Sequence, residues 1–136
     1  MEQFNLINNF SNRNIAYYKS FGFDYSQIEE IMLGFQNGLT TEQIMVYADI
    51  QFNNCQMYQI RNALEDGLSI NQVTVFADPQ YSVYQMRIIC QTLKSGISIQ
   101  QVKQLANQNY DVCKLSSMYQ RLVYRQRHYW YKELSA

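Results

Sequence analysis

The residues best suited to chemistry in this sequence are cationic and aromatic side chains near its C-terminus. The candidates for contact with a partner are Arg121, Tyr124, Arg125, Arg127, His128, Trp130 and Lys132. Cations pair with phosphates and rings stack on bases, so this stretch fits nucleic-acid binding. Trp, Tyr and Arg are also enriched at protein–protein hot spots, so it fits a protein or dimer contact. A third interpretation is a capping helix whose rings cover the last structural unit while its charges stay in water.

A second candidate surface is acidic and lies in the first half of the chain. Its members are Glu29, Glu30, Glu65 and Asp66. They fall between the apolar positions of two predicted helices, so we expect them to face solvent. One interpretation is an ordinary solvated helix face. The other is an acidic surface that imitates nucleic-acid phosphates and occupies a basic groove on a partner protein.

Residues for catalysis or metal binding are sparse. His128 is the one histidine, and a Ser or Cys nucleophile would need that histidine close beside it. Cys55, Cys90 and Cys113 form no CxxC pair, and a zinc site needs several Cys and His at ligand spacing. No glycine-rich phosphate loop occurs. We therefore expect a non-enzymatic protein with no catalytic residues, no metal and no cofactor.

The elements that carry these residues follow a repeat of 29 residues. Residues of one type recur at this step, namely Gly38, Gly67 and Gly96; Gln27, Gln56 and Gln85; and the aromatics Phe23, Phe52, Tyr81 and Tyr110. A fixed period in this range is typical of stacked supersecondary units.

Each repeat predicts two helices, because it carries two N-terminal capping signals. The first series of cap residues is Asp24, Asn53, Ser82 and Asp111, and the second is Ser11, Thr40, Ser69 and Ser98. In the first series a Gln stands three residues on, which completes a capping box, until Lys114 departs in the fourth copy. Apolar residues recur at i, i+3 and i+7 after each cap of the first series, as on one face of a helix. Long helices are thus expected over 24–37, 53–66 and 82–95, and short ones over 11–20, 40–48, 69–77 and 98–106.

The predicted fold is all-α, either a short α-solenoid or a compact helical bundle of about three and a half helix-pair repeats. We expect one helical-repeat domain over 1–136. Its parts are a half repeat at 11–23, repeats at about 24–52, 53–81 and 82–110, and a capping helix at 111–133. The last helix should be the longest, because Arg125 replaces the glycine that closes the others.

Charge is balanced over the whole chain but not along it. Residues 1–78 carry nine acids and three bases, a net charge of −6, whereas residues 79–136 carry two acids and eight bases, a net charge of +6. Such a separation can steer charged partners or favour contact between copies, so a homo-oligomer is a further expectation. With no run of about 18 apolar residues, no signal-peptide pattern and an odd number of cysteines, we expect a reduced, cytoplasmic protein without membrane contact.

One repeat also bears a resemblance to known sequences. Gln56-Met57, Ile60-Arg61, Gly67-Leu68 and Phe76-Ala77-Asp78-Pro79 resemble a tandem repeat found in proteins of gut Firmicutes and of their phages and mobile elements. The resemblance covers 23–110 and departs at Ile50 and at Asn107-Gln108.

The resemblance implies helical repeats and a mobile-element setting. Short helical proteins of that setting often inhibit host defence, anti-CRISPR proteins among them. By analogy it implies a protein–protein interaction module that binds a partner in the host cytoplasm, such as a defence nuclease complex. The alternative from the residues themselves is a nucleic-acid-binding protein that uses the basic aromatic C-terminal helix.

Overall fold

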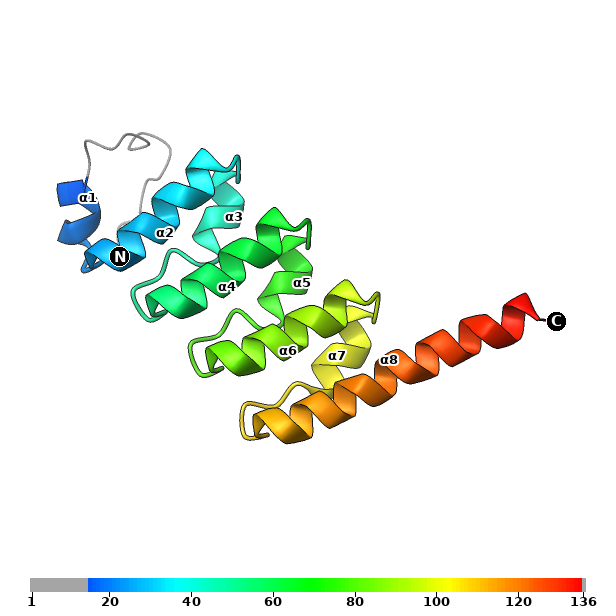
Figure 1. The fold of residues 1–136 in the computed structure, drawn as a ribbon. Helices are drawn as coiled ribbons and strands as arrows, with labels where there is room; N and C mark the ends of the chain where they lie inside the picture. Colours follow the sequence, from blue (N-terminus) through cyan, green and yellow to red (C-terminus); the bar gives the residue numbers. More distant parts are fainter. Residues whose placement is uncertain (1–14, 136) are drawn as a thin grey trace. The chain divides into compact units, whose positions relative to one another are not determined.

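The computed structural model describes residues 15–135 of the chain, and every regular element among them is a helix (Figure 1). In order these are α1 (Ile15–Ser20), α2 (Tyr25–Gln36), α3 (Thr41–Met45), α4 (Asn54–Glu65), α5 (Ile70–Thr74), α6 (Val83–Lys94), α7 (Ile99–Leu105) and α8 (Val112–Leu134). The all-α prediction is confirmed, as is the alternation of long and short helices. The predicted cap at Ser11 lies outside the described residues.

The chain divides into two compact units, which are described separately. Unit 1 runs to Ile70 and unit 2 begins at Asn71, so the boundary falls within α5. In unit 1, α2 packs along α4, while α1 and α3 contact α2. In unit 2, α6 packs along α8, and α7 contacts both. The apolar series predicted for the long helices is buried in both units: Ile28, Ile31, Phe35, Met57, Ile60, Leu64, Met86, Ile89 and Leu93.

The long helices begin where the sequence places their caps. The cap side chains of Asp24, Asn53 and Ser82 each accept a hydrogen bond from the backbone N–H three residues on. The glutamine at that position returns one, because its Oε1 accepts from the backbone N–H of the cap at 2.8–2.9 Å. The helices then close at Gly38, Gly67 and Gly96, which have φ of 90°, 97° and 87°. Only glycine adopts this left-handed conformation without strain, so the predicted stop signals are confirmed.

The short helices α3 and α5 are shorter than their spacing predicts, whereas α7, with its caps at Ser98 and Ala106, matches the predicted 98–106. α3 ends at Met45, although the pattern extends to residue 48. There the backbone tightens: the N–H of Val46 bonds the carbonyl of Gln43, and the N–H of Tyr47 bonds that of Ile44. Three-residue steps of this kind are a common ending for a helix, and here they turn the buried Tyr47 ring into the core of unit 1.

The glutamines of the capping boxes have a second function. In unit 1, Nε2 of Gln27 donates to the backbone carbonyls of Ile50 at 3.2 Å and Phe52 at 2.7 Å. In unit 2, Nε2 of Gln85 donates to the carbonyls of Gln108 at 3.0 Å and Tyr110 at 2.8 Å. One side chain thus caps its own helix and also holds the loop that leads to the next long helix. This double use explains why glutamine recurs at this phase of the repeat.

Gly34, in the middle of α2, leaves room for the side chain of Tyr47. A Cβ added at Gly34 would overlap the Tyr47 hydroxyl. That hydroxyl is fixed, since it donates to the Glu30 carbonyl at 2.8 Å and the whole residue is buried. Burial also raises the pKa of the Tyr47 phenol well above its ordinary value, so the ring stays neutral.

The variant Gly34→Ala should therefore lose about 1–3 kcal/mol of unfolding free energy, although alanine favours helix more than glycine does. Urea unfolding followed by circular dichroism measures the loss. Adding Tyr47→Phe to Gly34→Ala removes the overlapping oxygen and should recover part of it. If Gly34→Ala proved as stable as the parent, the close approach of α2 and Tyr47 would be refuted.

Candidate partner-binding site on the last helix

The last helix is built in two parts. α8 has 23 residues, whereas its neighbour α6 has 12. In the first part Leu115 and Tyr119 are buried, and the Tyr119 hydroxyl donates to the Val102 carbonyl at 3.3 Å. Burial raises the pKa of Tyr119, as expected for a phenol held in a core. Further along, Nε2 of Gln126 donates to the Gly96 carbonyl at 3.2 Å.

Beyond Gln126 the helix is exposed on all sides. Every residue from Arg127 to Ser135 is solvent-accessible, and we call residues 127–134 distal α8. The longer C-terminal helix, predicted over 111–133, is confirmed as one continuous element that starts at the cap Asp111. Its distal part has no buried residue, although Arg127 lines a groove with α6 and Tyr129 lines a pocket with Ser98 and Gln101.

We call the side of α8 on which Leu115 and Tyr119 are buried its packing stripe, and distal α8 continues this side. Trp130 follows Tyr119 by eleven residues, which is about three helical turns, so both lie on the same side of the helix. Tyr119 is buried on that side, whereas Trp130 is 57% exposed and Tyr129 is 62% exposed. Two large rings therefore stand where packing residues would stand if another helix lay alongside.

A cationic ridge runs along another side of α8. We give this name to Arg121, Arg125 and Lys132, which are spaced by four and seven residues and are all exposed. Arg121 occupies the repeat phase of Gly34, the position that lies against Tyr47 and Ile44 in unit 1. In the fourth repeat α8 continues in place of a short helix, so a long charged side chain is tolerated there.

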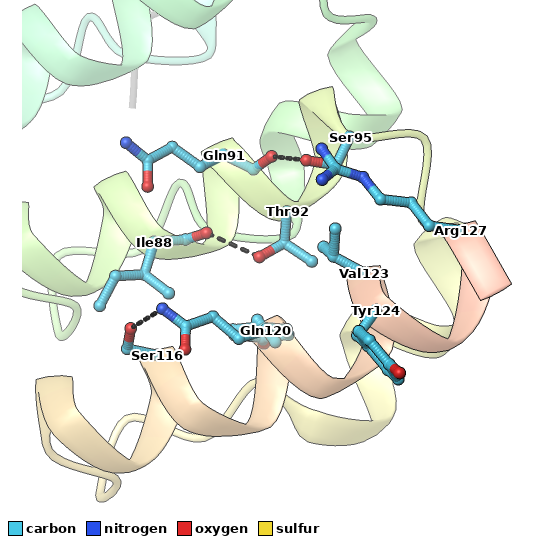
Figure 2. Close-up of a pocket in the computed structure, with 10 residues that line it drawn as sticks. Ile88, Gln91, Thr92, Ser95, Ser116, Gln120, Val123, Tyr124 and Arg127 are labelled. Carbon is cyan, nitrogen blue, oxygen red and sulfur yellow. Dashed lines mark hydrogen bonds between the residues drawn. The ribbon is translucent and has the colours of Figure 1, made fainter.

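The remaining predicted site residues lie on other sides of α8. The His128 ring stacks on that of Tyr124, with centroids 5.8 Å apart and planes 10° apart. Arg127 stands near one end of a groove between α6 and α8 (Figure 2). All seven C-terminal candidates are thus exposed, as a binding surface requires, but they cover several sides of the helix and not one face.

The groove between α6 and α8 has a volume of about 360 Å³. Ile88, Thr92 and Val123 contribute aliphatic groups to its lining (Figure 2). The Thr92 hydroxyl donates to the carbonyl of Ile88 at 2.9 Å, which leaves its methyl group as part of an apolar lining. Polar side chains line the rest of it, namely those of Gln91, Ser95, Ser116, Gln120, Tyr124 and Arg127. The composition is that of a ligand groove, apolar inside with a few polar groups around it.

The four acidic candidates do not form one surface. Glu29 and Asp66 are exposed, as predicted. The prediction is wrong for Glu30 and Glu65, whose side chains are only 13% and 20% exposed. Both carboxylates accept hydrogen bonds from Arg61, at 2.8 Å from Nε to Glu30 and at 2.8 Å from Nη1 to Glu65. They stabilise the contact of α2 with α4 and so are poorly placed to imitate phosphates.

The repeat pattern alone did not identify Arg61 as a structural residue. It is 6% exposed, and burial alone would lower its pKa; its hydrogen bonds with Glu30 and Glu65 outweigh that effect and raise the pKa. The spacing of Arg61 and Glu65, four residues on one helix, was a usable signal. The partner in α2 was harder to find, since Glu30 precedes Arg61 by one repeat plus two residues.

Among residues 15–135 no group of three or more His, Cys, Asp and Glu side chains is placed to hold a metal ion. Cys55 and Cys113 are exposed, Cys90 is buried, and none of the three forms a disulfide. Within the same described stretch no helix has the length and apolar character needed to cross a membrane.

Comparison with known proteins adds no relative whose function could be transferred. The chain matches no protein-family model, no curated protein and no solved structure. The argument for function therefore rests on the surfaces described above.

Proposed function

We propose that this protein is a non-enzymatic interaction module that binds a partner protein through distal α8. The observation that carries the proposal is the exposed ring of Trp130, which lies on the side of the helix where Tyr119 is buried and stands next to the exposed ring of Tyr129. Exposed Trp and Tyr beside Arg127 have the composition of a protein–protein hot spot. Exposing large aromatic rings to water is unfavourable in free energy unless a partner buries them.

The arrangement of rings and cations favours a protein partner over a nucleic acid. Trp130 lies about half a turn around the helix from the cationic ridge of Arg121, Arg125 and Lys132. A single strand that followed the ridge would therefore not reach the indole. A helix or groove of a partner protein that packs on the Trp130 side needs no contact with the ridge.

Nucleic-acid binding remains the second candidate, and one observation favours it. The stacked pair Tyr124 and His128 lies beside the ridge, so a strand that contacts Arg125 could also stack a base there. Binding of this kind would weaken steeply as salt is added, because cations that neutralise phosphates release counterions.

Capture from a host lysate with and without nuclease separates the two functions. We expect the parent chain to capture a protein partner even after nuclease treatment. The Trp130→Ala variant and a chain truncated after Gln126 should both fail to capture it. The truncation keeps Leu115, Tyr119 and the contact of Gln126 with Gly96, so unit 2 should stay folded. Once the partner is isolated, its affinity for Trp130→Ala should be about 30-fold weaker than for the parent.

Tyr84→Ala is the matched control, because Tyr84 is as exposed as Trp130 but lies on α6. It should leave the captured protein unchanged. If Trp130→Ala captured as much as the parent, the assignment to distal α8 would be wrong. If nuclease treatment removed the partner, nucleic-acid binding would become the favoured function.

Among protein partners we propose a component of a host defence system, such as a nuclease complex. The support is the resemblance of the repeat at Gln56-Met57 and Phe76-Ala77-Asp78-Pro79 to repeats of phages and mobile elements. Co-expression with a defence system tests this: plating of a targeted phage should rise with the parent chain and not with Trp130→Ala.

A further inference from the structure

The groove between α6 and α8 has a counterpart in unit 1, two repeats earlier. Counting back 58 residues from Ile88, Tyr119 and Val123 leads to Glu30, Arg61 and Glu65. In unit 1 these three positions hold an arginine between two carboxylates; the Arg61–Glu30 pair joins α4 to α2, and the Arg61–Glu65 pair lies within α4. Asn37 adds a bond to the same site, since its Nδ2 donates to Glu65 at 2.9 Å.

In unit 2 the same positions hold apolar or aromatic residues. Ile88 and Val123 replace the two carboxylates, and the buried Tyr119 ring replaces Arg61. Ser95 replaces Asn37, and its hydroxyl donates to the carbonyl of Gln91 in its own helix at 3.0 Å. No side chain of this set reaches across from α6 to α8 as Arg61 does in unit 1, and the groove stays open (Figure 2).

The charge around this open groove is unbalanced. Arg127 lines it, and no ion pair to Arg127 occurs within residues 15–135. From Asn71 onward the chain carries eight bases and three acids, and none of those acids, Asp78, Asp111 and Glu133, lines the groove. The groove therefore combines an apolar interior with a cation that has no carboxylate, whereas its counterpart in unit 1 contains both charges.

We propose that this groove is the docking site for an acidic, amphipathic segment of the partner protein. An apolar side chain of that segment rests on Ile88, Thr92 and Val123, and a neighbouring carboxylate pairs with Arg127. The volume of about 360 Å³ is enough for one or two side chains, which suits an anchor and not a whole ligand. The inference rests on the proposed function and names the partner chemistry next to distal α8.

The test uses the full chain and two synthetic helical peptides of about 16 residues, since shorter peptides rarely stay helical in water. One peptide carries Leu and Glu on one face, and its twin carries Gln in place of every Glu. Binding is followed by the anisotropy of a label on the peptide. The fluorescence of Trp130, the only tryptophan, gives a second signal one turn from Arg127.

We expect the Glu peptide to bind and the Gln twin to bind at least about tenfold more weakly, the value of one charge-assisted hydrogen bond. Arg127→Gln should weaken the Glu peptide by a similar factor. Val123→Phe, which fills the groove, should also weaken it. Arg121→Gln is the matched control, since it removes the same charge from the ridge and does not line this groove; it should change binding by less than about twofold. Circular dichroism checks that each variant is folded.

Three results would overturn the proposal: no binding of the Glu peptide, equal binding of the twin, or equal weakening by Arg121→Gln and Arg127→Gln. The last would mean that charge attracts the peptide without a site. These results are independent of the lysate experiment. If capture of the protein requires Trp130 but binding of the peptide does not depend on Arg127, only the groove proposal is wrong. If the peptide requires Arg127 while no captured protein requires Trp130, the function assigned to distal α8 fails.

Discussion

Replacing Gln85 with alanine should lower the free energy of unfolding by about 2–4 kcal/mol. The reason is that three hydrogen bonds depend on one side chain. Its Oε1 accepts from the backbone N–H of Ser82 at 2.8 Å, and its Nε2 donates to the carbonyls of Gln108 and Tyr110. The side chain is largely buried, so alanine would leave these backbone groups without a partner in a place that water reaches poorly. Urea unfolding followed by circular dichroism gives the value.

Two further variants identify which bonds matter. Gln85→Glu keeps the acceptor for the cap but presents a carboxylate to two carbonyls, so it should be at least as destabilising as alanine. Lys114→Gln, at the same phase in the fourth repeat, should cost less than about 1 kcal/mol, because Lys114 only lies over the Tyr110 ring at 4.1 Å. A small cost for Gln85→Ala, comparable to that of Lys114→Gln, would show that the loop is held by other contacts.

Replacing Arg61 with methionine should destabilise unit 1 by about 3 kcal/mol. The guanidinium lies between Glu30 and Glu65, and its removal leaves two carboxylates close together in a site with little access to water. Breaking a buried pair by removing one partner costs about 3–5 kcal/mol, and the low end applies because both carboxylates keep some exposure. Thermal and urea unfolding both measure the change. Methionine is a residue that the repeat already uses at this phase, at Met32.

The triple variant Glu30→Ile, Arg61→Met, Glu65→Val tests the cause. It copies the apolar residues Ile88 and Val123 into unit 1 and removes all three charges together. Replacement of an ion-pair network by apolar residues of similar size is often neutral or stabilising, so this variant should recover most of the loss. If the triple variant were less stable than Arg61→Met alone, the shape of the Arg61 side chain, and not its charge, would be what unit 1 requires.

Much of the fold was predictable because its signals are local. A cap residue and a glutamine three positions on are read within one turn of helix, and the structure has both bonds at Asp24, Asn53 and Ser82. The glycines that end the long helices are also a local signal, because each depends only on the positive φ of one residue. The length of α8 followed from one substitution, Arg125 at the glycine phase.

The candidate site was predicted less well, because its properties depend on contacts between distant residues. The sequence placed Trp130 and Arg127 in one basic aromatic stretch, but the structure puts one on the continuation of the packing stripe and the other beside a groove. The groove itself requires knowledge of α6 and α8 together. Glu30 looked like a surface charge for the same reason: its partner Arg61 lies on the next long helix.

The forward reach of the glutamine side chains has a consequence for how this protein can change in length. Gln27 and Gln85 bond carbonyls 23 and 25 residues downstream, so each of these two 29-residue segments supplies a donor for the loop that follows it. A tandem duplication of one such segment would carry its own donor and find its own acceptors, whatever the number of copies. Lys114 marks the copy where that rule ends. Gene duplication can thus lengthen the chain in whole steps while α8, with the proposed partner-binding surface, is inherited unchanged.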